Sequence, residues 1–358
     1  MIAKCFAQLL DPFGNISRHG AFHYSLNLDV WSKIITGPRK TIIIYNPFAG
    51  RMGGKGLKRL SGAAEILREA GHETWLVPTQ GPGTAGAIAR RSIAEGAGLI
   101  LAAGGDGTIN EIAEGVAFSD VPLGILPAGT ANVLANEMGL GSSIERAAAV
   151  LGDCIPTRIS IGRLRCVNGA ERSRLFLLMA GIGLDARIVY NLSLPLKARF
   201  GKLAYWIGGF SLLGRHLDEF EVVVEGRRVG CAFALISKVR NYGGDLEIAQ
   251  NTSLLDDRFE VVLFEGSSSF RFLMYLARVA VRRLNGVPGI SLIRSGCIAM
   301  PGTATNRVYV QVDGEYAGHI PASVEIVPDA LTLLIPEAYV RKNRHRAAEA
   351  SACRAVDR

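Results

Sequence analysis

The segment Gly104-Gly105-Asp106-Gly107-Thr108 follows an apolar run, residues 98–103, that is typical of a buried strand. A glycine turn between a strand and a helix lets backbone N–H groups approach a phosphate, and the helix N-terminus attracts an anion. A carboxylate in such a turn repels the phosphate unless it holds a metal ion or takes a proton, and both roles suit phosphoryl transfer. By itself the segment is equally consistent with an ordinary turn in which Asp106 caps a helix.

Two further glycine-bearing loops also follow predicted strands. Residues 46–56 read Asn-Pro-Phe-Ala-Gly-Arg-Met-Gly-Gly-Lys-Gly, which is a flexible loop with a mobile cation and lacks the Gly-Lys-Ser/Thr ending of a Walker A loop. Residues 127–132 read Pro-Ala-Gly-Thr-Ala-Asn. Ligands of open α/β sheets collect at the carboxyl ends of strands, so three such loops predict a phosphate-binding edge.

A fourth element, Asp313-Gly314-Glu315, lies far downstream. Asp-Gly between apolar runs is a strong signal for a β-hairpin. On this pattern alone, the segment is a plain turn.

The elements that must position these loops fall into two groups. In the first half, predicted strands at 41–45, 74–77, 98–103 and 123–126 alternate with predicted helices at 57–70, 84–95, 109–116 and 131–138. Such alternation indicates parallel strands joined by right-handed crossovers. After about residue 155, short runs rich in Val, Ile and Phe predict an antiparallel β-sandwich or barrel, at 175–180, 220–224, 232–237, 259–264 and 308–312. Two helices, near 197–216 and 268–285, interrupt these strands.

The predicted organisation is an N-terminal extension over 1–37, an α/β nucleotide-binding domain over 38–155, a β-sandwich domain over 156–340 and a basic tail over 341–358. The net charge of +8 suits an anionic partner. The six cysteines form no Cys-x-x-Cys pair, which argues against a zinc site. The apolar stretches Leu175–Leu184 and Leu203–Gly214 are too short to span a bilayer. A cytoplasmic protein that lies on the inner face of the membrane without crossing it is therefore expected.

From Thr41 to about Val340 the chain resembles the diacylglycerol kinase catalytic family, which includes bacterial lipid kinases, sphingosine kinases and ceramide kinases and is distantly related to NAD kinases. The resemblance implies a nucleotide domain followed by a β-sandwich that holds the lipid, with the active site between them. Six motifs match in order: Asn46-Pro47 with Gly50, Gly104 to Thr108 with Asn110-Glu111, Gly129 to Asn132, Gly181 to Ala186, Gly201 to Tyr205, and Asp313 to Glu315.

The resemblance also implies roles for single residues. Glu315 matches the proton acceptor of bacterial members, Asp106 matches the base proposed in sphingosine kinases, and Asp313 belongs to the same catalytic set. Which carboxylate is the base stays open. The implied contacts of ATP are Asn46, Pro47, Gly50, Lys55, Thr79, Gly104, Gly105, Asp106, Gly107, Thr108, Ile109, Asn110, Thr130 and Asn132.

Magnesium is implied twice by the resemblance. One Mg²⁺ should bridge the transferred phosphates. A second, structural Mg²⁺ should be held by Asp257 and the carbonyl groups of Leu254 and Phe259, and oxygen ligands of this kind suit a hard cation. Arg258 stands where the family usually has glycine, and a solvated turn is the alternative for this loop. Ser160 stands where many members carry an aspartate, which in sphingosine kinases contacts the lipid head group.

Residues 270–284 have a helical pattern that suggests contact with a membrane. Phe270, Leu273, Met274, Ala277, Val281 and Leu284 fall on one expected face, and Arg271, Arg278 and Arg282 fall on another with Tyr275 between them. Apolar and basic faces on one helix suit an anionic bilayer. A core-facing helix with a solvated basic side is the alternative.

The sequence therefore predicts a lipid kinase that uses ATP and Mg²⁺, with a lipid at the membrane surface as its substrate and no nucleic acid partner. The alternatives are an NAD kinase-like enzyme with a soluble substrate and a non-catalytic module that binds nucleotide or lipid. The oligomeric state stays open, a homodimer included.

Overall fold

The computed structural model describes residues 39–168, 170–184, 186, 217–242, 246–280, 284, 286–302 and 308–344. The predicted helix over 197–216, the Gly201–Tyr205 motif, Asp185, Arg282 and the N-terminal extension lie outside the described residues.

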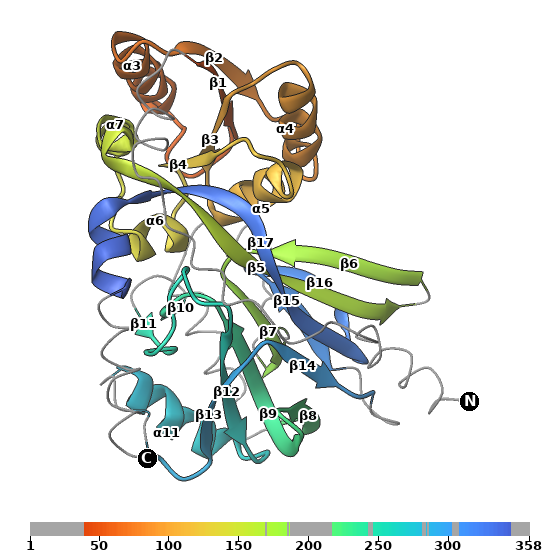
Figure 1. The fold of residues 1–358 in the computed structure, drawn as a ribbon. Coiled ribbons are helices and arrows are strands. Elements are labelled where there is room, and N and C mark those ends of the chain that lie inside the picture. Colours follow the sequence, from red (N-terminus) through yellow and green to blue (C-terminus); the bar gives the residue numbers. More distant parts are fainter. Residues whose placement is uncertain are drawn as a thin grey trace, which may run out of the picture.

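The first half of the chain forms a parallel sheet in the order β2-β1-β3-β4, covered by helices on both faces (Figure 1). Each strand except the edge strand β2 is almost fully buried, which explains its continuous apolar sequence. This confirms the predicted α/β architecture. The elements are β1 Lys40–Tyr45, α3 Gly56–Glu69, β2 Glu73–Pro78, α4 Ala85–Ala94, β3 Leu99–Gly104, α5 Asp106–Val116, β4 Leu123–Pro127, α6 Val133–Glu137 and α7 Ile144–Ala149.

The second half is an antiparallel β-sandwich, as predicted. Its elements are β5 Cys154–Asn168, β6 Ala170–Phe176, β7 Met179–Gly183, β8 Phe220–Val224, β9 Arg227–Ser237, β10 Asn241–Tyr242, β11 Leu246–Glu247, β12 Phe259–Glu265, α11 Ser269–Ala280, β13 Ile290–Ser295, β14 Cys297–Met300, β15 Tyr309–Val312, β16 Glu315–His319 and β17 Ala322–Pro336. A short 3-10 helix, Leu151–Asp153, precedes β5, and a helix over 337–344 follows β17. The run 175–180, expected as one strand, is divided between β6 and β7.

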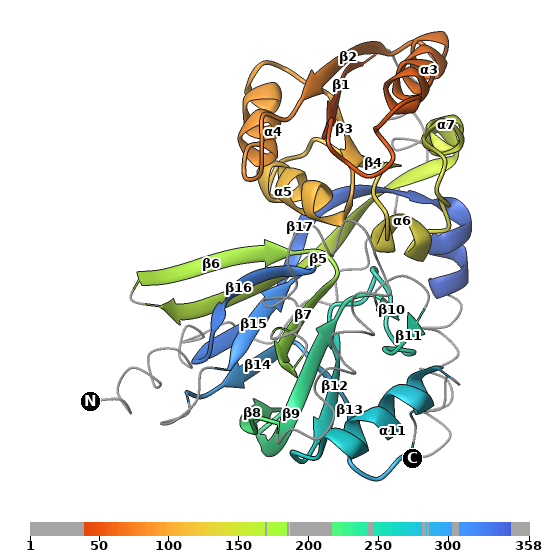
Figure 2. The ribbon, with the colours of Figure 1, turned by 180° about the vertical axis from the view of Figure 1, so that it is seen from behind.

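Strand β17 belongs to both halves. It pairs antiparallel with β5 from Ala322 to Pro336, with β14 near its start and in parallel with β4 at Leu333. Figures 1 and 2 show β5 and β17 running side by side from the helix-covered sheet into the sandwich. The parallel sheet and the sandwich therefore form one continuous hydrogen-bonded structure.

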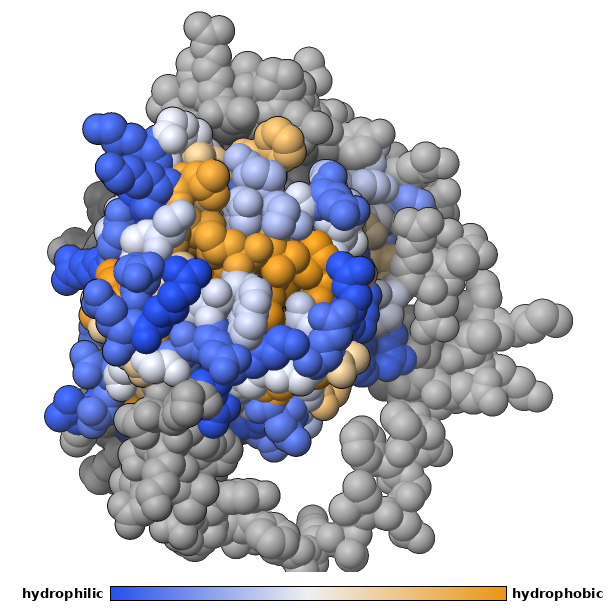
Figure 3. Space-filling model, turned by 90° about the horizontal axis from the view of Figure 1, so that it is seen from above, coloured by the Kyte–Doolittle hydropathy of each residue, from blue (hydrophilic) through white to orange (hydrophobic). Residues whose placement is uncertain are grey.

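The edge strand β2 closes the sheet at the end of the molecule away from the sandwich. Its Trp75 side chain is 43% exposed, and Leu76 and Val77 are half-buried. Figure 3 views this end from above and shows an apolar band amid polar side chains. No helix within the described ranges is long and apolar enough to cross a membrane.

Gly162 on β5 provides a test of the packing inside the sandwich. A Cβ atom at this position would overlap the ring of Phe176, which is fully buried and stacks on Phe259 at 5.8 Å between ring centroids. Gly162→Ala should therefore lower the free energy of unfolding by about 1–3 kcal/mol through overpacking. Urea denaturation measures this loss. Gly152→Ala is the matched control, because no heavy atom lies within 4 Å of its added Cβ. Equal midpoints for the two variants would contradict this packing.

Candidate active site

The three glycine-bearing loops meet at the carboxyl ends of β1, β3 and β4. The N–H of Asn46 donates to the carbonyl of Ala103 at 3.0 Å, and the N–H of Ala128 donates to the carbonyl of Gly104 at 3.0 Å. The N–H of Arg51 reaches across to the carbonyl of Ala128, also at 3.0 Å. Backbone bonds therefore hold the loops in register, as the shared edge of a parallel sheet requires.

Glycine is required where two of these loops touch. A Cβ atom on Gly129 would overlap the Cα atom of Gly105, so the two backbones lie in direct contact. A Cβ atom on Gly50 would lie 2.8 Å from Oγ1 of Thr130. The loops are packed against one another through backbone, and larger residues would force them apart.

Several residues that were expected to contact the nucleotide hold the three loops in place. The side-chain amide of Asn46 donates to Oγ1 of Thr108 at 3.2 Å. Asn132 is buried and exchanges two hydrogen bonds with Gly129, at 2.8 and 2.9 Å. The amide of Asn110 donates to the carbonyl of Leu175, which ties α5 to the sandwich. These three amides are engaged within the protein.

The remaining expected contacts differ in their exposure. Ile109 is buried, and its N–H donates to the carbonyl of Gly105, so neither group is free to bind a ligand. Thr79 is buried, and its N–H donates to the carbonyl of Tyr45 at 2.8 Å. Lys55 is exposed at the start of α3, and Pro47 is half-buried. Among the expected nucleotide contacts, Lys55 is thus the cationic side chain that is exposed to solvent.

Asp106 is the first residue of α5 and holds the next helix in place. Its two carboxylate oxygens accept the N–H groups of Val133 and Leu134, at 3.0 and 3.2 Å, at the start of α6. Burial raises the pKa of Asp106 above its ordinary value, and these two N–H donors oppose the rise. The Asp106 carboxylate therefore helps to fix the position of α6 relative to the three loops.

Asp313 and Gly314 form the two-residue turn between β15 and β16, as the hairpin signal predicts. Both residues have positive φ, 49° and 82°, which a type I′ turn requires. The Asp313 carboxylate is buried and accepts the N–H groups of Leu177, Leu178 and Met179 at 2.9 to 3.0 Å. This anchor explains why β6 and β7 separate at residues 177 and 178: their N–H groups bond to Asp313 instead of to a neighbouring strand.

The anchored turn places Glu315 beside the glycine-rich segment. A Cβ atom on Gly107 would lie 2.7 Å from Oε1 of Glu315, so the carboxylate lies against the N-terminal turn of α5. Its other oxygen accepts a hydrogen bond from Arg174 on β6 at 3.0 Å, and the Glu315 side chain remains 45% exposed. The structure thus brings Asp106, Asp313 and Glu315 to one place from segments about 200 residues apart in the sequence.

Comparison with known proteins agrees with this arrangement. Residues 40–164 match the diacylglycerol kinase catalytic domain, and residues 179–335 match the YegS C-terminal NAD kinase beta sandwich-like domain. A diacylglycerol kinase of Bacillus subtilis is 30% identical over 291 residues, which cover 79% of this chain and 92% of the relative. The chain belongs to the diacylglycerol kinase catalytic family.

Other relatives extend this similarity to the whole fold. A diacylglycerol kinase of Mycobacterium tuberculosis strain H37Rv is 27% identical over 302 residues, which cover 83% of this chain and 95% of the relative. The crystal structure of a diacylglycerol kinase from Bacillus anthracis superposes with a TM-score of 0.67 and 22% identity, over 84% of this chain and 98% of the other. The fold class therefore rests on both sequence and structure, and the family rests on sequence.

The loop in which the family resemblance implies a structural Mg²⁺ has a different arrangement. Asp257 accepts a hydrogen bond from Ser160 at 2.5 Å, and the Asp256 carbonyl accepts one from the buried ammonium of Lys238. Burial lowers the pKa of Lys238 to about 8, against the attraction of Asp256 and Asp257, so the group is charged at neutral pH. Arg258 points elsewhere, toward Glu225.

These residues do not fit a divalent ion. The resemblance implies Leu254, Asp257 and Phe259 as ligands, yet a buried ammonium already faces this loop and would repel a metal ion. Across the part of the chain that the structure describes, no three His, Cys, Asp or Glu side chains are grouped so as to hold a metal. Ser160, expected near the lipid, is buried and bonded to Asp257.

Helix α11 packs differently from the expected arrangement of its faces. Tyr275 and Val279 are buried, whereas Met274 is 43% exposed and Ala277 is exposed. Met274 and Ala277, expected on the apolar face, are thus exposed, and Tyr275, expected between the arginines, is buried. The Tyr275 ring packs on Phe264 at 5.0 Å, and Phe264 stacks on Phe233 at 4.8 Å, so aromatic packing sets the rotation of the helix.

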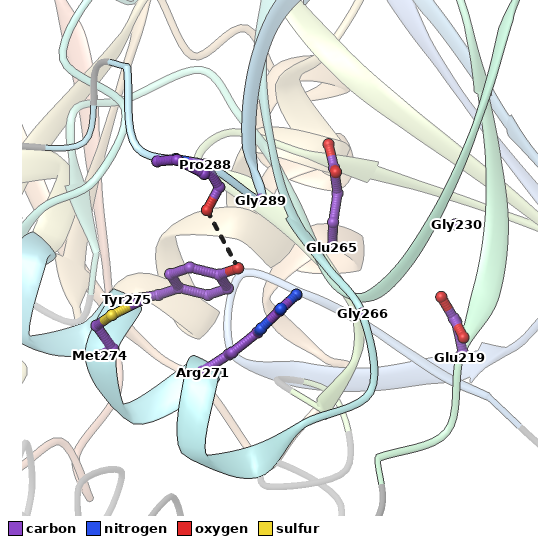
Figure 4. Close-up of a pocket in the computed structure, with 9 residues that line it drawn as sticks. All are labelled: Glu219, Gly230, Glu265, Gly266, Arg271, Met274, Tyr275, Pro288 and Gly289. Atoms are coloured by element: carbon purple, nitrogen blue, oxygen red, sulfur yellow. Dashed lines mark hydrogen bonds between the residues drawn. The ribbon is translucent and has the colours of Figure 1, made fainter.

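A pocket of about 600 Å³ opens beside this helix (Figure 4), and Figure 1 shows the helix at the end of the sandwich away from α5. Glu219, Glu265, Arg271 and Tyr275 are among its lining residues. Figure 4 shows Arg271 pointing into the pocket, while Arg278 is exposed further along the helix. The pocket is distinct from the three-loop site.

Sequence reasoning missed Arg174 and Lys238. Arg174 lies on a strand with no motif around it, so nothing local marks it as the partner of Glu315. Lys238 directly follows seven buried residues of β9, and a lysine at the end of such a run is a weak signal of a buried charge.

Asp313 supplies a pH-dependent test of the site. Burial raises its pKa from 3.8 to about 7, with added repulsion from Asp106 and opposition from the three N–H donors. A raised carboxyl pKa favours the folded state at low pH, and this contribution is lost as pH rises through about 7. The free energy of unfolding of the unmodified protein should therefore fall between about pH 5 and about pH 8 more steeply than that of Asp313→Asn. Urea titrations across this range provide the comparison, and parallel slopes would contradict it.

Proposed function

We propose that this protein is a lipid kinase that transfers the γ-phosphate of ATP to a hydroxyl group of a diacylglycerol-like lipid. The observation that carries the proposal is the contact between Glu315 of the sandwich and Gly107 of the glycine-rich segment. The contact brings an exposed carboxylate of one half of the chain against the glycine-rich segment of the other half, where we propose that the phosphates bind. The two relatives described above are both named diacylglycerol kinases, which supports a lipid as the acceptor.

The three loops suit a nucleotide phosphate. The N-terminus of α5 and the glycine-rich backbone supply N–H donors and a favourable potential for an anion. Gly53 and Gly54 face open space, and the Lys55 side chain is exposed beside them. In this proposal the loop over residues 46–55 covers the phosphates and Lys55 neutralises part of their charge.

The donor set also fits a Mg²⁺ ion that arrives with the nucleotide. The Asp106 carboxylate is a hard oxygen ligand of the kind that Mg²⁺ prefers, and the phosphates of the nucleotide would supply the others. When bound, the ion would neutralise charge on the transferred phosphate. Asp106 is suited to this role because the N–H groups of Val133 and Leu134 fix its orientation.

Glu315 suits the role of proton acceptor better than Asp106 does. Both oxygens of Asp106 accept backbone hydrogen bonds, whereas Glu315 is 45% exposed and has one oxygen paired with Arg174. We infer that Arg174 orients Glu315, that Glu315 accepts the proton of the lipid hydroxyl, and that Asp313 holds the turn that carries it. Positioning of the hydroxyl beside the phosphate supplies much of the acceleration.

Two alternatives remain distinguishable by experiment. An NAD kinase-like activity would phosphorylate a soluble nucleotide and leave lipids unmodified. A non-catalytic module would bind ATP without turnover. An assay with labelled ATP against a panel of lipids in micelles, with NAD as a parallel acceptor, separates all three.

The central prediction concerns the carboxylates of Glu315 and Asp106. Glu315→Gln and Asp106→Asn should each lower kcat by at least ~100-fold, the scale of lost general-base catalysis. Asp106→Asn should also lower the free energy of unfolding by about 1–3 kcal/mol, because an amide cannot accept both N–H groups of α6. Lipid phosphorylation is measured after circular dichroism confirms the fold. Glu221→Gln is the control, since Glu221 is 40% exposed and pairs with Arg228 in a similar ion pair. Near-normal turnover in both site variants would refute the assignment.

The proposed site of membrane contact is the exposed side of α11 together with the rim of the adjoining pocket. Arg271, Met274 and Arg278 are exposed and lie three or four residues apart on the helix, and Arg271 and Met274 also line the pocket. A cationic and apolar surface of this kind suits an anionic bilayer, where each arginine contributes about 1 kcal/mol. Arg282 belongs to the same expected set.

Vesicle binding tests this surface. Changing Arg271 and Arg278 to Gln should weaken binding to anionic vesicles at low salt by roughly tenfold or more, since two favourable charges are lost. Turnover on a soluble short-chain diacylglycerol should stay near normal, because the helix is remote from Glu315. Arg91→Gln on the exposed side of α4 serves as the control. Unchanged vesicle binding would identify the basic face as a solvated surface.

A further inference from the structure

Lys238 is a buried lysine whose charge the proposed reaction does not use. It directly follows β9, its side chain is fully buried, and its N–H donates to the carbonyl of Leu178 at 2.8 Å. Its ammonium donates to the carbonyl of Asp256. A buried ammonium is costly unless charges and acceptors compensate it, so its surroundings require an explanation.

The loop over residues 251–259 is folded around this charge. The Asp256 carboxylate accepts the N–H of Ser253 at 3.0 Å and pairs with Arg294 at 2.9 Å. The Asp257 carboxylate accepts the hydroxyl of Ser160 on β5 at 2.5 Å. Both carboxylates attract the Lys238 ammonium electrostatically. The loop thus has the chemistry of a cation site, because its Asp256 carbonyl accepts from the Lys238 ammonium and its two acidic side chains attract that charge.

We propose that the Lys238 ammonium is the resident cation of this loop and replaces the divalent ion that the family resemblance implies at Leu254, Asp257 and Phe259. The ammonium donates to the carbonyl of Asp256, the neighbour of Asp257 in the chain, so a metal ion held in the same loop would be repelled by it. The chain therefore keeps this loop ordered without a structural metal. Arg258 is not the cation of this loop, because its side chain is exposed and directed toward Glu225.

The loop is connected to the three-loop site by a chain of hydrogen bonds. The N–H of Leu254 donates to the hydroxyl of Tyr339 at 3.2 Å, and that hydroxyl donates to Glu137 at 2.9 Å. Glu137 is the last residue of α6, whose first turn is held by Asp106. Lys238 is therefore a positioning residue, since it orders the loop whose Leu254 supports the far end of α6.

Thermal unfolding without nucleotide tests this proposal. The melting temperature of the unmodified protein should be the same in excess EDTA and in excess Mg²⁺. Lys238→Met should melt roughly 3–10 °C lower in EDTA, because the Asp256 carbonyl loses its donor and the two acidic side chains lose a nearby positive charge. Added Mg²⁺ or Mn²⁺ should recover part of that loss by binding to the acidic loop in place of the ammonium. Lys58→Met, at an exposed position on α3, should respond to neither.

A measurement on the unmodified protein keeps the proposal testable if Lys238→Met does not fold. Mn²⁺ binding, followed by electron paramagnetic resonance without nucleotide, should be the same for the unmodified protein and for Asp257→Asn. A Mn²⁺ site that Asp257→Asn abolishes, or a Mg²⁺-dependent rise in melting temperature that it abolishes, would overturn the proposal. Equal melting temperatures of Lys238→Met and the unmodified protein would also overturn the proposal. None of these readouts depends on kinase activity, so the failure of one proposal leaves the other standing.

Discussion

The ladder between β5 and β17 is the constraint on which the rest of the structure depends. It runs antiparallel from Ala322 to Pro336, and its end near Leu333 joins the parallel sheet through β4. The two halves therefore share backbone hydrogen bonds instead of meeting only through side chains. Because β16 directly precedes β17 in the chain, this ladder also fixes where the β15–β16 turn lies relative to α5. A site built from both halves can then be rigid, which catalysis of phosphoryl transfer by positioning requires.

Acidic residues around the site mostly serve as acceptors for backbone N–H groups. Asp106 holds the start of α6, Asp313 holds the link between β6 and β7, and Glu111 accepts the N–H groups of Gly83 and Ala85 before α4. Each buried carboxylate loses hydration, and the N–H donors compensate part of that loss. Glu315 differs because it is exposed and paired with a single arginine. This contrast separates carboxylates that build the site from the one best suited to exchange a proton.

The same distinction applies to cations. Lys55 is exposed on a loop of open glycines, where a ligand can reach it, whereas Lys238 is enclosed by acceptors of its own chain. The Lys238 ammonium is buried and donates to the Asp256 carbonyl, so a substrate cannot reach it. It can instead order a loop in the way that a bound metal does. The position of a charged group relative to solvent thus decides whether it acts on a ligand or on the fold.

The sequence by itself determined the two architectures and the three glycine-bearing loops, because these depend on local patterns. Apolar periodicity marks each buried strand, and the carboxyl ends of parallel strands must share an edge. The Asp313-Gly314 turn could likewise be predicted from the sequence, since a turn with two positive φ angles favours these residue types. The rotation of α11 was not, because the contact of Tyr275 with Phe264 sets it and periodicity carries no information about a partner's shape. Only the tertiary structure paired Glu315 with Arg174 and Gly107, and Lys238 with Asp256. These partners lie on separate strands and loops, and the distance between them is set by the sheet and not by their spacing in the chain.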